Sequence, residues 1–207
     1  EPFNLAPFSK VTNEDYLPAF IKLIEAKKKE IAIIISNPKD PTFENTIQRL
    51  EFSGERLNRV ASVFFNMLSA ETSPEIQKIA QNVFPLLTEL TNYITLNNDL
   101  FDRVRSVFEK RSELDLSVEK KTLLDNTYKN MSRNGANLSD SEKEMIRKID
   151  KELDLLTLKF SENLLAETNI YELHLTNEVD LKGLPDGEKE SAALLAKSKG
   201  RKGWLIT

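Results

Sequence analysis

Apolar and small residues recur between Phe43 and Leu68 at alternating steps of four and three residues. This spacing places them along one side of an α-helix, as in the seam of a coiled coil. The seam predicts a helix of about 28 residues, roughly 40 Å long, that packs against other helices. Its members are Phe43, Ile47, Leu50, Gly54, Leu57, Ala61, Phe64 and Leu68.

One glycine interrupts the apolar seam. In a helix interior, glycine costs about 1 kcal/mol of stability relative to alanine. Two interpretations explain Gly54: a neighbouring helix approaches closely there, or the helix kinks or breaks at Ser53–Gly54. Both interpretations are consistent with the sequence.

The composition favours long elements and excludes several classes of site. Only 6 glycines and 8 prolines occur in 207 residues, so turns are few. There is no cysteine and a single histidine, His174, which excludes disulfides, zinc fingers, thiol nucleophiles and the HExxH zinc helix from this segment. The net charge of −4 and the pI near 5.3 argue against a nucleic-acid binder. No apolar run approaches the roughly 20 residues of a membrane span.

Capping patterns divide the chain into further helices. Helices are expected to begin after Thr12, Thr42, Ser73, Asn97–Asp99, Asp115 or Ser117, and Ser139. The first should end near Asn37, before Pro38, and the third should kink at Pro85. The helix that follows the Ser139–Glu142 capping box carries a long apolar stripe: Met145, Ile149, Leu153, Leu156, Phe160 and Leu164.

The two ends of the chain differ from its helical middle. Residues 1–12 are expected to form an extended arm packed by its aromatic rings, with Pro2, Phe3, Pro7 and Phe8. Near the other end, Tyr171–Thr176 alternates with a period of two residues, which predicts a strand. An amphipathic helix is expected over 186–199, and Trp204–Thr207 has the composition of a second strand.

These elements define a mainly α fold class. We expect a bundle of long antiparallel helices over residues 1–169. Residues 170–207 are expected to form a strand–helix–strand segment, which supplies a small two-strand β element near the C-terminus. An apolar, β-type tetrapeptide is an unusual end for a chain, so we expect this segment to lead into an absent catalytic domain.

His174 is a candidate general base or lone metal ligand. It lies on the expected strand, on the same face as Glu172 and Thr176. Since residues of a strand alternate between its two faces, a solvent-facing structural histidine is the simpler interpretation. No serine lies in a nucleophile-elbow motif.

Five carboxylates that follow Ser139 are candidate metal ligands: Glu142, Glu144, Asp150, Glu152 and Asp154. A di-iron bundle requires Glu-x-x-His pairs, which this sequence lacks. We therefore expect an ion-paired, solvated face, formed with the interleaved Lys143, Arg147, Lys148 and Lys151.

Two basic clusters are candidate contacts for phosphate or a membrane surface. They are Lys27–Lys29 and the turn Lys197–Lys202, which includes Arg201. In an acidic chain such short clusters usually face solvent, and Lys28 is expected to lay its aliphatic stem along the helix. Phe64–Met67 is a candidate ligand pocket, but its place in the seam predicts that Phe64 is a core residue with Phe65 on the flank.

Five stretches, in order along the chain, resemble the thimet-type zinc oligopeptidases. That family includes thimet oligopeptidase, neurolysin, oligopeptidase A and peptidyl-dipeptidase (dipeptidyl carboxypeptidase). The stretches resemble part of its first helix, the opening of its second, its second-to-third helix junction, the end of its long N-terminal helix and a Gly-Leu-Pro turn. They are Leu17–Phe20, Pro41–Ile47, Val60–Glu75, Phe160–Thr168 and Gly183–Pro185. The junction resembles the peptidyl-dipeptidase branch most.

The resemblance implies a two-lobed, almost all-helical peptidase with a deep channel for short, unfolded peptides. In that family an HExxH helix and a downstream glutamate hold zinc in the C-terminal lobe, and the motif glutamate acts on the bound water. This sequence lacks the motif, so no catalytic, cofactor-binding or metal residue is assigned to any position. We expect an inactive, zinc-free N-terminal segment that forms a channel wall and contacts its own C-terminal catalytic domain. A cytoplasmic location is expected, with a periplasmic one also compatible.

A second interpretation is a self-contained helical adaptor without enzymatic activity. Such a protein would offer a groove to partner helices. The two interpretations differ in what the gene encodes beyond Thr207. An HExxH motif several hundred residues further on would identify a peptidase.

Overall fold

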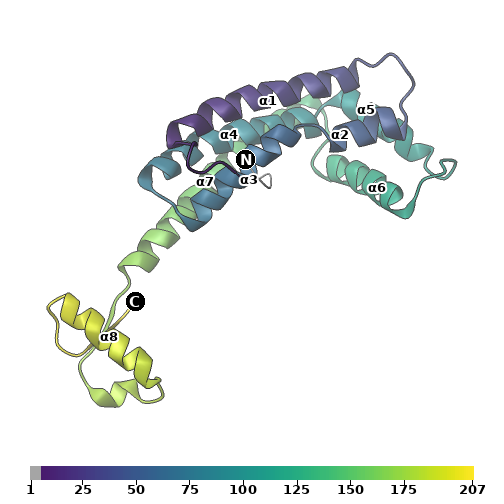
Figure 1. Ribbon diagram of the computed structural model, residues 1–207. Coiled ribbons are helices and arrows are strands. Elements are labelled where there is room, and N and C mark those ends of the chain that lie inside the picture. Colours follow the sequence, from purple (N-terminus) through teal and green to yellow (C-terminus); the bar gives the residue numbers. More distant parts are fainter. Residues whose placement is uncertain (1–5) are drawn as a thin grey trace. The chain divides into compact units, whose positions relative to one another are not determined.

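The computed structural model describes residues 6–207 and confirms a mainly α chain with a two-stranded sheet near the C-terminus (Figure 1). The helices are α1 (Asn13–Ile35), the π-helix η2 (Phe43–Gln48), α2 (Arg49–Glu51), α3 (Glu55–Ala70), α4 (Pro74–Thr95), α5 (Asn98–Glu109), α6 (Val118–Arg133), α7 (Asp140–Ile170), the 3-10 helix η3 (Glu178–Leu181) and α8 (Asp186–Ser198). The strands are β1 (Leu173–Leu175) and β2 (Trp204–Ile206).

The arm predicted at the start of the chain is described only in part. Pro2 and Phe3 lie outside the described residues. Phe8 is 58% exposed, so the expectation that its ring packs the arm is wrong. A turn forms at this point instead, in which the N–H of Lys10 donates to the carbonyl of Pro7 over 2.8 Å.

Local capping explains where most helices begin. The side chains of Thr42, Ser73, Asn97 and Ser117 each accept a hydrogen bond from a backbone N–H in the first turn, as predicted. This satisfies one of the donors that a helix start leaves free. α4 continues as one helix through Pro85, and the predicted kink there stays a prediction.

The chain divides into two compact units, and the division falls inside α7, between Leu155 and Leu156. The first unit holds α1 to α6 and the first half of α7. The second holds the rest of α7 with β1, η3, α8 and β2. The predicted domain boundary between residues 169 and 170 stays a prediction.

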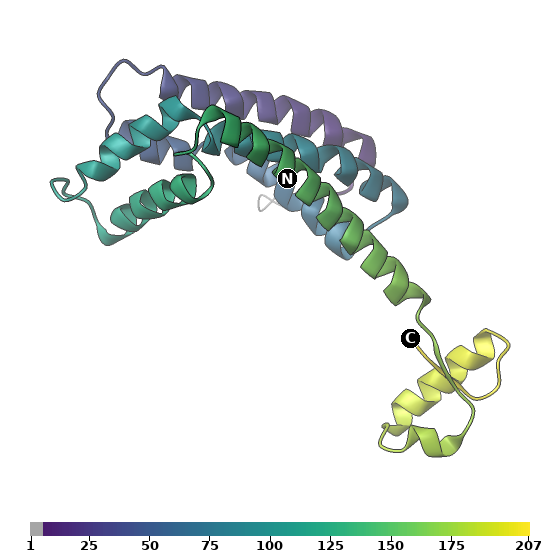
Figure 2. The ribbon, with the colours of Figure 1, turned by 180° about the vertical axis from the view of Figure 1, so that it is seen from behind.

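In the first unit α1 lies beside α4 and α3, and its end also contacts α5 (Figures 1 and 2). An aromatic cluster joins the first part of α1 to α3 and α4, with ring centroids 5.1–6.5 Å apart; its members are Tyr16, Phe20, Phe64, Phe65 and Phe84. Phe64 is fully buried, so the prediction that it is core is confirmed. A second cluster joins the end of α1 to η2, α5 and α6 around Ile31, Ile34, Phe43, Ile47, Leu100 and Val104.

The seam from Phe43 to Leu68 does not form one helix. Helical structure ends at Glu51, Gly54 adopts a left-handed conformation with φ +73°, and α3 begins at Glu55. The expected continuous helix is therefore wrong, and the alternative of a break at Ser53–Gly54 is correct. The break allows the first half of the seam to join the second cluster while the other half packs in the aromatic cluster.

Gly54 also lies against a neighbouring helix. Its N–H donates to the Glu30 carboxylate of α1 over 2.7 Å, and a Cβ at Gly54 would collide with the side chain of Lys27. Both the positive φ and the close approach favour glycine at this position. The two interpretations of the sequence therefore hold together.

On the long helix α7 the burial of several side chains differs from the prediction. Lys143 was expected on a solvated face, but it is 1% exposed and its ammonium donates to the Asn98 side chain at the start of α5. The apolar stripe, by contrast, lies at the surface. The exposed fractions are 63% for Met145, 58% for Ile149, 57% for Leu153, 56% for Leu156, 68% for Phe160 and 57% for Leu164.

The second unit has a small core under its antiparallel strand pair. Leu173 pairs with Ile206, and Leu175 pairs with Trp204. Both predicted strands and the predicted helix between them are present. Outside α7, the buried side chains of this unit are Leu181, Ala192, Ala196 and Leu205.

Candidate functional site

His174 has a structural position on β1. It is exposed, and its Nε2 lies 2.7 Å from the carbonyl oxygen of Lys202, so a protonated Nε2 donates to that carbonyl. This contact ties β1 to the turn that precedes β2. The structure thus places His174 in a strand connection.

The candidate metal ligands do not form a metal site. Among residues 6–207 no group of three or more histidine and acidic side chains is arranged to hold a metal ion. Glu142 instead completes the capping box of α7, where hydrogen bonds from Ser139 lower the pKa of its carboxyl. Glu144 forms an ion pair with Arg147. Partial burial and, to a smaller extent, the negative charge of Asp150 raise the pKa of Asp154.

The catalytic zinc ion implied by the family resemblance is held by the two histidines of an HExxH helix and a further glutamate. The described residues offer one histidine, and it is engaged with a backbone carbonyl. They therefore do not fit a catalytic zinc ion.

The first basic cluster is used within the bundle. Burial lowers the pKa of Lys27, whose stem packs against Gly54. Lys28 is paired with Glu25 and Glu89, at 3.2 and 3.4 Å. Desolvation alone would lower the pKa of Lys28, but hydrogen bonds and the charges of both glutamates outweigh it and raise the pKa.

The second basic cluster is also engaged by an acidic residue. Lys199 and Arg201 both bind the carboxylate of Glu172, with 2.7 Å between Arg201 Nη1 and Oε2. The hydrogen bond from Lys199, with help from Arg201, lowers the pKa of Glu172. Lys28, Lys199 and Arg201 are thus engaged by carboxylates of the chain itself.

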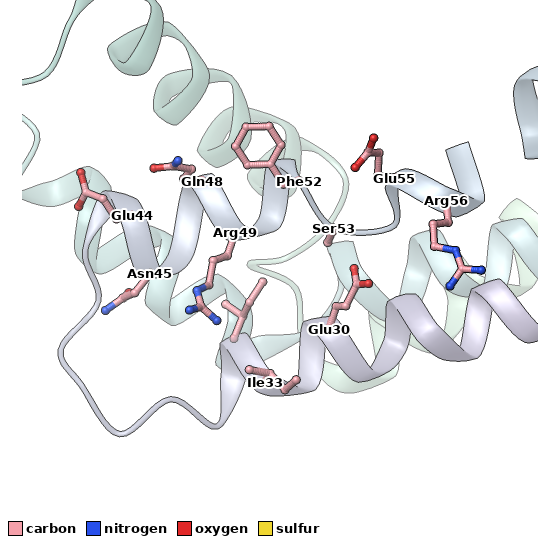
Figure 3. Close-up of a pocket in the computed structure, with 11 residues that line it drawn as sticks. Glu30, Ile33, Glu44, Asn45, Gln48, Arg49, Phe52, Ser53, Glu55 and Arg56 are labelled. Carbon is pink, nitrogen blue, oxygen red and sulfur yellow. The ribbon is translucent and has the colours of Figure 1, made fainter. Parts of the chain in front are cut away.

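The break in the seam creates a groove between α1 and the segment from η2 to the start of α3. It has a volume of about 790 Å³. Figure 3 shows Glu30 reaching from α1 towards the turn at Ser53, and Arg49 reaching from α2 towards α1. The lining residues are Glu30, Ile33, Ile34, Glu44, Asn45, Gln48, Arg49, Phe52, Ser53, Glu55 and Arg56.

A loop fixed by hydrogen bonds positions η2 at one end of this groove. Arg103 of α5 donates to the carbonyls of Asn37 and Lys39, at 2.9 and 3.3 Å, and to the Asn45 side chain at 3.2 Å. Asn45 in turn donates to the carbonyl of Asp40 over 2.8 Å. These contacts hold the connection from α1 to η2 in one conformation.

The groove combines charged and apolar groups at its surface. Arg49 and Arg56 form no ion pair with any described residue, and both are exposed. Phe52 and Ile33 are 69% and 57% exposed. Guanidinium groups bind carboxylates and peptide carbonyls, and exposed apolar side chains bind apolar ones. A π-helix such as η2 is also a rare element that occurs frequently at functional sites.

Sequence reasoning did not identify this groove. Arg49, Phe52 and Arg56 are spaced by three and four residues, which is a signal for a shared helix face. Nothing local connects them to Glu30 and Ile33, because the two segments meet only after the seam breaks at Gly54.

Comparison with known proteins shows similarity along nearly the whole chain. The dipeptidyl carboxypeptidase of Escherichia coli (strain K12) is 38% identical over 204 residues, which is 98% of this chain and 30% of that protein. The dipeptidyl carboxypeptidase of Salmonella typhimurium is 34% identical over 206 residues, with 99% and 30% covered. The oligopeptidase A of Haemophilus influenzae is 30% identical over 203 residues, with 98% and 30% covered.

The chain spans about 30% of the length of these relatives. No protein-family model matches it. No helix within residues 6–207 is both long enough and apolar enough to cross a membrane. The similarity nevertheless agrees with the five stretches that resembled the same proteins in the sequence. The chain is therefore homologous to part of the peptidases of the thimet oligopeptidase family, to which dipeptidyl carboxypeptidase and oligopeptidase A belong.

Proposed function

We propose that this chain is the N-terminal, non-catalytic part of a zinc-dependent peptidase that hydrolyses short peptides. The observation that carries the proposal is the similarity to dipeptidyl carboxypeptidase over 98% of the chain, against only 30% of that relative. A zinc ion and its ligands would then belong to the remainder of the polypeptide. The proposal includes the peptidyl-dipeptidase type, because the identities to the two dipeptidyl carboxypeptidases exceed that to the Haemophilus influenzae oligopeptidase A.

In this proposal the segment forms part of the wall of the substrate channel. Helices as long as α1 and α4 are rigid enough to exclude folded substrates by their bulk. A wall also aligns a peptide with the reacting groups, and lost alignment reduces the rate as well as binding. A cytoplasmic or periplasmic enzyme acting on peptides fits the cysteine-free, acidic composition.

The groove between α1 and α2 is the surface we assign to peptide contact. It is open to solvent, and Arg49 and Arg56 line it without an ion pair to any described residue. The positive groups suit the carboxylates and carbonyl oxygens of a peptide. Phe52 and Ile33 suit its apolar side chains.

The experiment uses the full-length encoded protein and a ladder of peptide lengths. Arg49→Ala and Arg56→Ala are compared with Arg105→Ala, which removes another exposed arginine. Arg105 pairs with Asp102 on α5, outside the groove. We expect each groove variant to raise KM by up to about 5-fold and to shift the length preference, since exposed charge contacts contribute up to about 1 kcal/mol. The pH profile of kcat should stay unchanged, because the proposed zinc-bound water sets it.

Two results would count against the proposal. If a groove variant abolished kcat for all peptide lengths while fold and zinc content stayed intact, the segment would hold a catalytic group. If the full-length protein contained no HExxH motif and hydrolysed no peptide, the adaptor interpretation would replace the peptidase interpretation.

A further inference from the structure

The stripe on α7 is an apolar surface that the described structure leaves uncovered. We use the name α7 stripe for Met145, Ile149, Leu153, Leu156, Phe160 and Leu164. All six side chains are more than half exposed. Three of them precede the division of the chain into units and three follow it, on one continuous helix.

The less exposed side of α7 differs from the side that carries the stripe. Lys143 and Leu158 are buried, and Ile146, Arg147, Asp150 and Asp154 of the first unit are half-buried. The apolar side of the helix thus faces solvent while a largely polar side faces the bundle. Figure 2 shows the first half of α7 at the front of the first unit.

An exposed apolar stripe of this length is unusual for a monomeric protein. Soluble monomers rarely expose contiguous apolar patches larger than a few hundred Å², and larger patches mark interaction surfaces. Within each unit, three large exposed side chains on successive turns of α7 contribute to such a patch. A partner that covers the stripe would remove it from water, which is favourable in proportion to the apolar area.

The spacing of the stripe argues against a left-handed coiled coil formed with a second copy of this chain. Its steps are four, four, three, four and four residues. A two-stranded, left-handed coiled coil with a second copy would require alternating steps of three and four. The observed pattern follows an 11-residue repeat, which does not match the left-handed coiled coil.

The length of the relatives indicates which polypeptide could supply the elements that cover the stripe. The matched segment is about 30% of each, so more than two thirds of their length has no counterpart in this chain. That length is ample for a further set of packed helices. We propose that the α7 stripe is the docking surface for the part of the same polypeptide that lies outside this segment. This inference rests on the proposed function and specifies which surface of the segment meets the remainder.

The experiment uses cysteine accessibility, because residues 1–207 contain no cysteine. Ile149→Cys probes the stripe. Lys151→Cys is the matched control, since it is also exposed and lies two positions away, on nearly the opposite side of the helix. Each variant is made both in the 207-residue chain and in the full-length encoded protein. A maleimide is added, and the rate of modification of the introduced cysteine is measured by peptide mass.

In the 207-residue chain both cysteines should react rapidly. In the full-length protein Ile149→Cys should react at least about tenfold more slowly, because modification then requires local opening, while Lys151→Cys should keep its rate. Leu153→Cys provides a second stripe position if Ile149→Cys fails to fold.

Three results would overturn the proposal. The stripe cysteines could react as fast in the full-length protein as in the segment. The control could be slowed as much as the stripe, which would show no preference for this side. Protection could already arise in the 207-residue chain and increase with its concentration, which would identify a second copy as the partner. Peptidase activity is assayed separately, so a failure of the surface and a failure of the proposed function give different results.

Discussion

Two long helices of this chain carry similar apolar stripes and yet differ in burial. On α4 the side chains of Ile76, Ala80, Val83 and Leu90 are at most 4% exposed. On α7 every member of the stripe is more than half exposed. The comparison shows that amphipathic periodicity identifies the apolar side of a helix. It does not identify whether that side is buried within this segment.

The largest expected difference comes from one substitution made on each helix. Leu90→Ala on α4 should reduce the free energy of unfolding by about 2–5 kcal/mol, because it leaves a cavity in a packed site. Leu153→Ala on α7 removes the same atoms from a side chain that is 57% exposed and should cost below about 1 kcal/mol. Urea unfolding of the 207-residue chain measures both. Similar losses for the two variants would show that the α7 stripe is covered within this segment.

The second prediction concerns the break at Gly54. The break allows both halves of the seam to be buried, as the apolar stripe of α4 is and that of α7 is not. Gly54→Ala places a Cβ at φ +73° and against Lys27, so we expect a loss of about 1–3 kcal/mol. Gly187→Ala is the control. Gly187 lies in the first turn of α8 with open space around it, and alanine there should be neutral or stabilise by up to about 0.5–1 kcal/mol.

Circular dichroism during urea unfolding distinguishes the two glycine variants. A Gly54→Ala variant as stable as the parent chain would mean that the seam can continue as one helix through this position.

The smallest effect concerns an exposed ion pair in the second unit. The lowered pKa of Glu172 means that its carboxylate stabilises the folded state above its ordinary value near 4.5. This contribution is lost as the pH falls through the lowered value. Glu172→Gln should therefore be less stable than the parent chain at pH 7, and the difference should disappear in acid. Trp204, the single tryptophan of the chain, reports on this unit by fluorescence. A difference that persisted at low pH would assign the effect to packing.

Local signals account for what the sequence predicted correctly. A capping side chain such as Ser73 or Asn97 acts within one turn of helix, and the strand pair near the C-terminus follows from alternation over a few residues. The seam misled at Gly54 because the choice between a helix and a left-handed turn depends on Lys27 and Glu30, which belong to another helix. The burial of Lys143 depends in the same way on Asn98.

The candidate site was less accessible from sequence than the fold. Arg49, Phe52 and Arg56 have helical spacing, but their groove exists only where α1 supplies its second wall. The exposure of His174 could be predicted because residues of a strand alternate between its two faces. In the docking proposal, the exposure of the α7 stripe depends on polypeptide outside this segment, and no local pattern contains that information.

The central claim is that this chain supplies a scaffold and leaves the chemistry to the remainder of the polypeptide. The most direct test compares peptide hydrolysis and zinc content of the purified 207-residue chain with those of the full-length encoded protein, under the same conditions. We expect the full-length protein to retain stoichiometric zinc after dialysis and to cleave short peptides, and the 207-residue chain to do neither. Peptide cleavage by the 207-residue chain that survives repurification, or stoichiometric zinc bound to it, would contradict the account.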